Sequence, residues 1–138
     1  MTNEPVKILC VDDDPYVVKV LQRSLSKGQF QVLTAGSAEK GVEIFKLCSP
    51  VQIVIADFNL PSMNNVGFLR MVNQSSPEAV SILISSCAEP EVAASIDDHL
   101  IFRRLSKPWE RTELQQVITE ALAHISVGPA DKFPGGNS

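Results

Sequence analysis

The sequence has little of what marks a membrane, secreted or nucleic-acid-binding protein. No stretch approaches the roughly 18 consecutive apolar residues of a membrane span, and the opening segment MTNEPVK contains no apolar signal core. The 3 cysteines are odd in number and show neither a disulfide framework nor zinc-ligand spacing, which predicts reduced cysteines in an intracellular, cytoplasmic protein. The formal net charge of −4 argues against direct nucleic-acid binding, because such surfaces are usually basic.

Internal repeats are also absent, and the remaining composition is that of one globular domain. A length of 138 residues fits the range of about 100–200 residues that is common for a single domain. We expect residues 1–126 to form this domain. The Gly, Pro and polar residues of the segment 127–138, VGPADKFPGGNS, predict a flexible tail or the start of a linker.

Short apolar stretches alternate with stretches of helical periodicity along the chain. Strands are expected at 7–11, 30–34, 53–57, 81–85 and 100–105, and helices at 15–27, from 38 to before Pro50, and at 65–75, 89–97 and 110–126. Such alternation implies parallel strands joined by right-handed crossovers. The predicted fold class is therefore α/β, a doubly wound five-stranded parallel sheet with helices on both faces.

Local signals fix the ends of the first two helices. Asp14 suits the N-cap position, followed by Pro15 in the first turn, and Gly28 is expected to stop that helix. Ser37 can cap the next helix, whose buried stripe would comprise Ala38, Val42 and Phe45, with Leu47 as a further candidate.

The central stretch runs from Val51 to Pro61, VQIVIADFNLP. Its unbroken, β-branched apolar run predicts a strand buried on both faces, and that run ends abruptly on Asp57. The carboxylate would then lie at the carboxyl end of a central strand, where open α/β sheets bind their ligands. The alternative is that Asp57 only begins a turn, aided by Asn59 and Pro61.

Polar side chains follow the other strands at the same predicted edge. They are Asp12, Asp13 and Asp14 after the first strand, Ser85 and Ser86 after the fourth, and Lys107 after the fifth. Hard oxygen ligands of this kind suit Mg²⁺, which would also relieve the repulsion between carboxylates. Asp57 could act as a nucleophile toward phosphorus, with the metal, Lys107 and Ser85 stabilising the phosphoryl charge. The alternatives are a helix cap for the aspartates, a solvated loop for the lysine and a plain strand end for the serine.

At this point the chain resembles the receiver domain of two-component response regulators. The matching pieces are ILCVDDDP, IVIADFNLPSMNN, SILISS and LSKP, in that order, and the resemblance covers roughly residues 6–126. It implies a flavodoxin-like sheet with strand order 2-1-3-4-5. It also implies that a sensor histidine kinase or a phosphotransfer protein phosphorylates Asp57, and that this switches the face formed by the fourth helix, fifth strand and fifth helix. The protein would then be a signalling receiver and no enzyme beyond its own phosphorylation and dephosphorylation.

The resemblance also assigns roles to individual residues. Asp13 would bind Mg²⁺ directly and Asp12 mainly through water, with Asp57 and the backbone carbonyl of Asn59 completing the protein ligands. Ser85 would be the switch hydroxyl and Lys107 the lysine that pairs with the phosphoryl group. A possible homodimer through the signalling face is left open.

Two positions depart from the family pattern. The family usually has Gly where this chain has Asn65, but Asn also tolerates a positive φ. The family usually has an aromatic residue at the position of Arg104, and a guanidinium cannot repeat an aromatic side chain's move into an apolar slot. We hypothesise that Arg104 makes the signalling face charge-dependent, with Asp97 or Asp98 as a candidate partner.

Three further interpretations concern the output and the alternatives. The segment FRRLSKPWERTEL is similar to receivers fused to cyclic-nucleotide enzymes, notably HD-type phosphodiesterases, which suggests such an enzyme as an output domain or partner. A phosphatase of the haloacid-dehalogenase kind would instead use Asp12 as nucleophile and Asp14 as its acid. A degenerate receiver would act purely as an interaction module, although here the set of site residues is complete.

Overall fold

The computed structural model describes residues 5–26, 28, 30–57, 65–86 and 101–127. The strands are β1 (Val6–Val11), β2 (Phe30–Ala35), β3 (Ile53–Asp57), β4 (Val80–Ser86) and β5 (Arg103–Lys107). The helices are α1 (Pro15–Leu25), α2 (Ala38–Leu47), α3 (Asn65–Ser75) and α5 (Arg111–Val127). The helix expected at 89–97 and the predicted tail from 128 onward lie outside the described residues, as do Asp97 and Asp98. Within the described ranges, no helix is long and apolar enough to cross a membrane.

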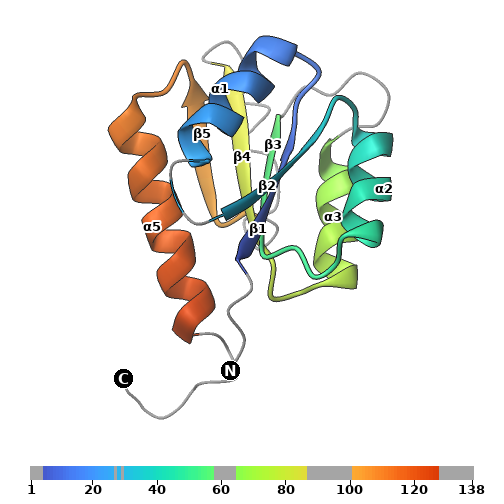
Figure 1. Ribbon diagram of the computed structural model, residues 1–138. Helices are drawn as coiled ribbons and strands as arrows, with labels where there is room; N and C mark the ends of the chain where they lie inside the picture. Colours follow the sequence, from blue (N-terminus) through green and yellow to red (C-terminus); the bar gives the residue numbers. More distant parts are fainter. Residues whose placement is uncertain (1–4, 27, 29, 58–64, 87–100, 128–138) are drawn as a thin grey trace.

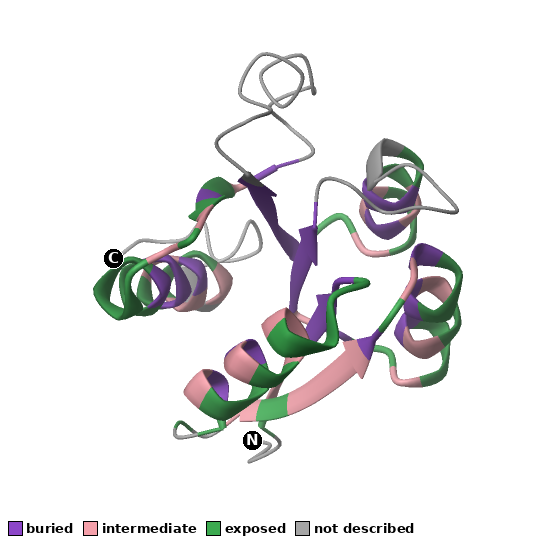
Figure 2. Cartoon of the chain, turned by 90° about the horizontal axis from the view of Figure 1, so that it is seen from above, coloured by how far each residue is buried: buried purple, intermediate pink, exposed green. Residues whose placement is uncertain are grey.

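The five strands form one parallel sheet in the order β2-β1-β3-β4-β5 (Figure 1). Viewed from above in Figure 2, α1 and α5 cover one face of this sheet and α2 and α3 cover the other. The predicted doubly wound α/β fold and its strand order are confirmed.

The core has two halves because alternate residues of a strand point to opposite faces of the sheet. In β3, Ile53 and Ile55 pack with the α1 and α5 side chains, whereas Val54 and Ala56 pack with those of α2 and α3. All five residues of β3 are buried. The prediction of a central strand buried on both faces is therefore confirmed.

The predicted N-caps are both formed. The Asp14 side chain accepts a hydrogen bond from the Tyr16 N–H at 3.0 Å, and the Ser37 hydroxyl accepts one from the Lys40 N–H at 3.1 Å. α1 ends at Leu25, somewhat earlier than predicted, and the Gly28 N–H donates to the Leu25 carbonyl. The prediction for Leu47 was wrong: this side chain is 78% exposed, because the last turn of α2 directs it away from the sheet.

The fifth strand is displaced along the sequence from its predicted position. Ile101 is buried and Phe102 is half-buried, yet both precede β5, and the ladder with β4 begins where Arg103 lies opposite Ile82. β5 is an edge strand in which only Leu105 is fully buried, so its sequence is polar. The prediction placed the strand too early because it followed the apolar residues Ile101 and Phe102, which precede β5. As a result, Lys107 is the last residue of β5 rather than a loop residue.

Candidate functional site: carboxylates at the carboxyl edge of the sheet

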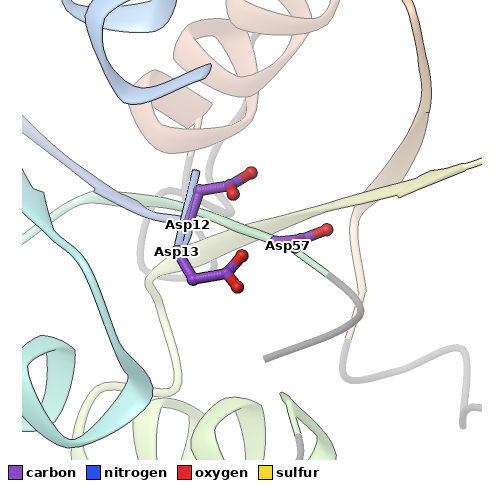
Figure 3. Close-up of side chains that lie close together, drawn as sticks. All are labelled: Asp12, Asp13 and Asp57. Atoms are coloured by element: carbon purple, nitrogen blue, oxygen red, sulfur yellow. The ribbon is translucent and has the colours of Figure 1, made fainter. Parts of the chain in front are cut away.

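Three carboxylates meet where β1 and β3 end. Asp57 is the last residue of β3, and Asp12 and Asp13 follow directly on β1. The two strands are adjacent and parallel, with Val11 opposite Ala56, so their ends coincide in space. One carboxylate oxygen from each aspartate lies within 4.8 Å of the other two. Figure 3 shows the three side chains pointing to the same side of the backbone.

The environment of these carboxylates is uneven. Asp12 is 1% exposed and Asp57 is 6% exposed, while Asp13 lies at the surface. The Asp12 N–H donates to the Ala35 carbonyl, and Asp12 Oδ1 accepts from the Asp14 N–H at 2.9 Å. These bonds hold the Asp12 carboxylate in place. Asp14 itself caps α1 and does not join the cluster.

Lys107 connects β5 to both buried carboxylates. Its Nζ lies 3.0 Å from Asp12 Oδ2 and 3.2 Å from Asp57 Oδ1. Burial lowers the pKa of Lys107, but hydrogen bonding and the negative charges of Asp12 and Asp57 together outweigh it and raise this pKa above its usual 10.5. The lysine therefore carries its positive charge throughout the neutral range.

Ser85 reaches the same edge from β4. Asp57 lies opposite Ile84 in the sheet, which places Ser85 one residue farther toward the carboxyl edge. The serine is buried and lies opposite Ser106 of β5. By strand alternation it belongs to the α2 and α3 side, whereas Asp57 and Lys107 belong to the α1 and α5 side. Asn59, the remaining predicted metal ligand, lies outside the described residues.

The donor set fits a hard divalent cation. Asp12 Oδ2 is buried, and the ammonium group of Lys107 lies 3.0 Å from it. This ion pair leaves further lone pairs on the carboxylate oxygens, which a divalent cation could share. Carboxylates are the protein ligands that Mg²⁺ prefers.

Sequence reasoning missed two features beside this site. Tyr16 is 73% exposed and borders a hollow formed with Val17, Val20 and the segment Lys107–Trp109. The sequence did contain a signal for the Tyr16 feature. Tyr16 is an aromatic residue in the first turn of α1, directly after the acidic cluster. Burial, helped by the charge of Asp12, raises the pKa of Cys10 to about 12, so this cysteine of β1 is a neutral core residue. Trp109 and Phe102 pack against the core.

The fold and the site define a class of phosphoacceptor signalling domains, and comparison with known proteins identifies the family. Residues 8–119 match the model of the response regulator receiver domain, and the chain belongs to this family. Its function is phosphorylation-dependent signalling in two-component systems. The phosphatase alternative therefore has no support, since the sheet and its ordered motifs are those of a receiver.

Individual relatives agree with this assignment. The chain is 30% identical over 123 residues to the hydrogenase transcriptional regulatory protein HoxA of Cupriavidus necator. The aligned region covers 88% of this chain and 25% of HoxA. The signal receiver domain of an HD domain-containing protein from Pseudomonas fluorescens Pf-5 superposes with a TM-score of 0.80 at 29% identity, covering 90% of this chain and 99% of that one. The chain thus spans about a quarter of the length of the first curated relative.

Proposed function

We propose that Asp57 accepts a phosphoryl group from the phosphohistidine of a sensor kinase or a phosphotransfer protein. The observation that carries the proposal is the ion-paired cluster, in which one lysine lies within 3.2 Å of carboxylate oxygens from the ends of two different strands. Charges brought together in this way, on a rigid sheet edge, suit phosphoryl transfer, which depends on positioning and electrostatic stabilisation.

In this mechanism, an ionised Asp57 oxygen forms a bond to phosphorus while the bond between phosphorus and the donor nitrogen breaks. Asp12, Asp13, Asp57 and the Asn59 carbonyl would hold Mg²⁺, which supplies charge neutralisation for the carboxylates and the phosphoryl oxygens. Lys107 stabilises negative charge on the transferred group, and the Ser85 hydroxyl donates a hydrogen bond to it. Turnover is limited to the domain's own phosphorylation and dephosphorylation.

The proposal extends to the protein's context. Residues 1–126 are the receiver, and the segment that follows connects it to an output domain or presents it to a partner protein in the cytoplasm. The solved receiver domain from Pseudomonas fluorescens is part of an HD domain-containing protein. Together with the resemblance of the segment FRRLSKPWERTEL to receivers fused to HD-type phosphodiesterases, this leads us to include a cyclic-nucleotide enzyme among the proposed outputs. Phosphorylation would act as a local change of charge that biases a two-state element.

Intact mass spectrometry tests the proposal. The protein is incubated with acetyl phosphate or phosphoramidate and Mg²⁺, beside Asp57→Asn. We expect one added phosphoryl group that is absent in the variant and absent without metal. A folded wild type that binds Mg²⁺ but gains no mass from these donors or from phosphorylated kinases would indicate an interaction module instead. Steady phosphate release that survives Asp57→Asn and fails in Asp12→Asn would indicate a phosphatase.

A further inference from the structure

A groove runs between α1 and α5 on the face of the sheet that these helices cover. It has a volume of about 470 Å³, and we call it the α1–α5 groove. Its apolar floor consists of Leu25, Phe30, Leu114, Ile118 and Leu122. Its polar rim consists of Arg23, Ser24, Arg111, Gln115 and Thr119.

The floor is shaped by a close approach at Gly28. A Cβ atom at this position would lie 2.6 Å from Cε2 of Phe30, so the phenyl ring lies where a side chain at residue 28 would otherwise be. Glycine therefore leaves the ring as part of the groove wall. Phe30 and Leu122 remain only half-buried, although both pack against the core.

The rim is cationic although the chain as a whole is acidic. Arg23 and Arg111 are exposed, and none of the described residues that line the groove carries a carboxylate. Within the described part of the chain, neither guanidinium makes an ion pair or a side-chain hydrogen bond. Arg103, also on the α5 side, differs because its Nε lies 3.0 Å from Glu120 Oε1. The two rim arginines are therefore free to pair with carboxylates of a ligand.

One end of the groove lies away from the site of phosphoryl transfer. Phe30 is the first residue of β2 and lies opposite Val6, the first residue of β1. The carboxylates lie at the other end of these parallel strands. One end of the groove is thus near the amino edge of the sheet, away from Asp57.

We propose that the α1–α5 groove binds an amphipathic helix of a partner protein, with an apolar ridge flanked by carboxylates. The α5 residues of the groove recur at helical spacing from Arg111 to Leu122, which corresponds to about 16 Å or three helical turns. A ligand helix of that length would place apolar residues at i, i+3, i+4 and i+7 on the floor. Its carboxylates would pair with Arg23 and Arg111, and bidentate pairing of this kind favours arginine over lysine.

The test uses a synthetic 18-residue helical peptide of the stated pattern, with leucines on one stripe and glutamates on both flanks. Binding to the full chain is followed by fluorescence anisotropy without any phosphodonor, and the same titration is made on Asp57→Asn. We expect saturable binding that weakens with salt and is equal in both proteins. Loss of phosphorylation would therefore leave this result unaffected, which keeps the two proposals separable.

The controls decide between specific and general attraction. The double variant Arg23→Glu with Arg111→Glu should weaken binding at least about tenfold. The matched double variant Lys46→Glu with Arg70→Glu carries the same change of charge on α2 and α3 and should retain the wild-type affinity. Equal loss in both variants, or no binding of the peptide at millimolar concentration, would overturn the proposal. The proposal would also be overturned if sedimentation showed that the wild type and the α2–α3 variant are dimers of the chain itself, whereas the groove variant is a monomer.

Discussion

At the scale of single residues, Lys107 forms ion pairs with the carboxylates that a metal ion would also bind. Its ammonium group lies 3.0 Å from Asp12 Oδ2 and 3.2 Å from Asp57 Oδ1, and it repels a cation placed between them. We therefore predict that Lys107→Met binds Mg²⁺ more tightly than the wild type, by a few-fold to about tenfold. Isothermal titration calorimetry measures this. Lys40→Met, which removes an exposed lysine paired with Glu43, serves as the control and should leave the affinity unchanged.

The same lysine should make stability depend on alkaline pH. Its pKa in the folded protein is raised, so its stabilising effect is complete below the unfolded value of about 10.5 and is lost as the pH rises through the folded value. We expect Lys107→Met without metal to lower the free energy of unfolding at pH 7–9, and this deficit to shrink above about pH 10.5. Urea denaturation at each pH measures it. A deficit that stays constant up to pH 12 would show that packing, not charge, is responsible.

At the scale of elements, α2 packs closely on β1 and α3 through a glycine. A Cβ atom at Gly41 would lie 3.0 Å from Val11 Cγ2 and 3.1 Å from Phe68 Cε1. We predict that Gly41→Leu lowers the free energy of unfolding by about 1–3 kcal/mol, because overpacking must displace buried neighbours. Chemical denaturation measures the loss. Gly36→Ala is the control, since a Cβ atom there meets nothing within 4 Å, and it should stay within about 0.5 kcal/mol of wild type.

The edge strand β5 carries one of the two departures from the family pattern. Arg104 is exposed and lies opposite Leu83, on the sheet face away from α5. If this guanidinium makes the signalling face charge-dependent, Arg104→Phe should reduce the salt sensitivity of phosphorylation-dependent partner binding. The measurement is the affinity of the phosphorylated protein for its partner at two salt concentrations. Unchanged affinity and salt sensitivity would contradict the hypothesis.

At the scale of the whole molecule, patterns that depend on neighbours in sequence were predictable and those that depend on packing were not. The buried run ending on Asp57 and the caps Asp14 and Ser37 follow from local chemistry, so the sheet and its acidic edge could be predicted. The displacement of β5 could not, because an edge strand lacks the apolar signal of a central one. The pairing of Lys107 with Asp12 also depends on strand order, which brings together residues 95 positions apart in the sequence.

The clustered carboxylates should also limit the stability of the whole domain until a cation binds. Asp13 adds a third negative charge within 4.8 Å of two others, and functional sites commonly cost stability in this way. We predict that Asp13→Asn raises the melting temperature by a few °C without metal. For a domain of this size, each 1 kcal/mol added to the free energy of unfolding raises the melting temperature by about that many degrees. The wild type should gain about 2.7 kcal/mol at Mg²⁺ concentrations 100 times its Kd, and Asp13→Asn should lose most of that gain. Thermal unfolding with and without Mg²⁺ measures both effects. Glu78→Gln, an exposed residue before β4 at the other edge of the sheet, should show neither.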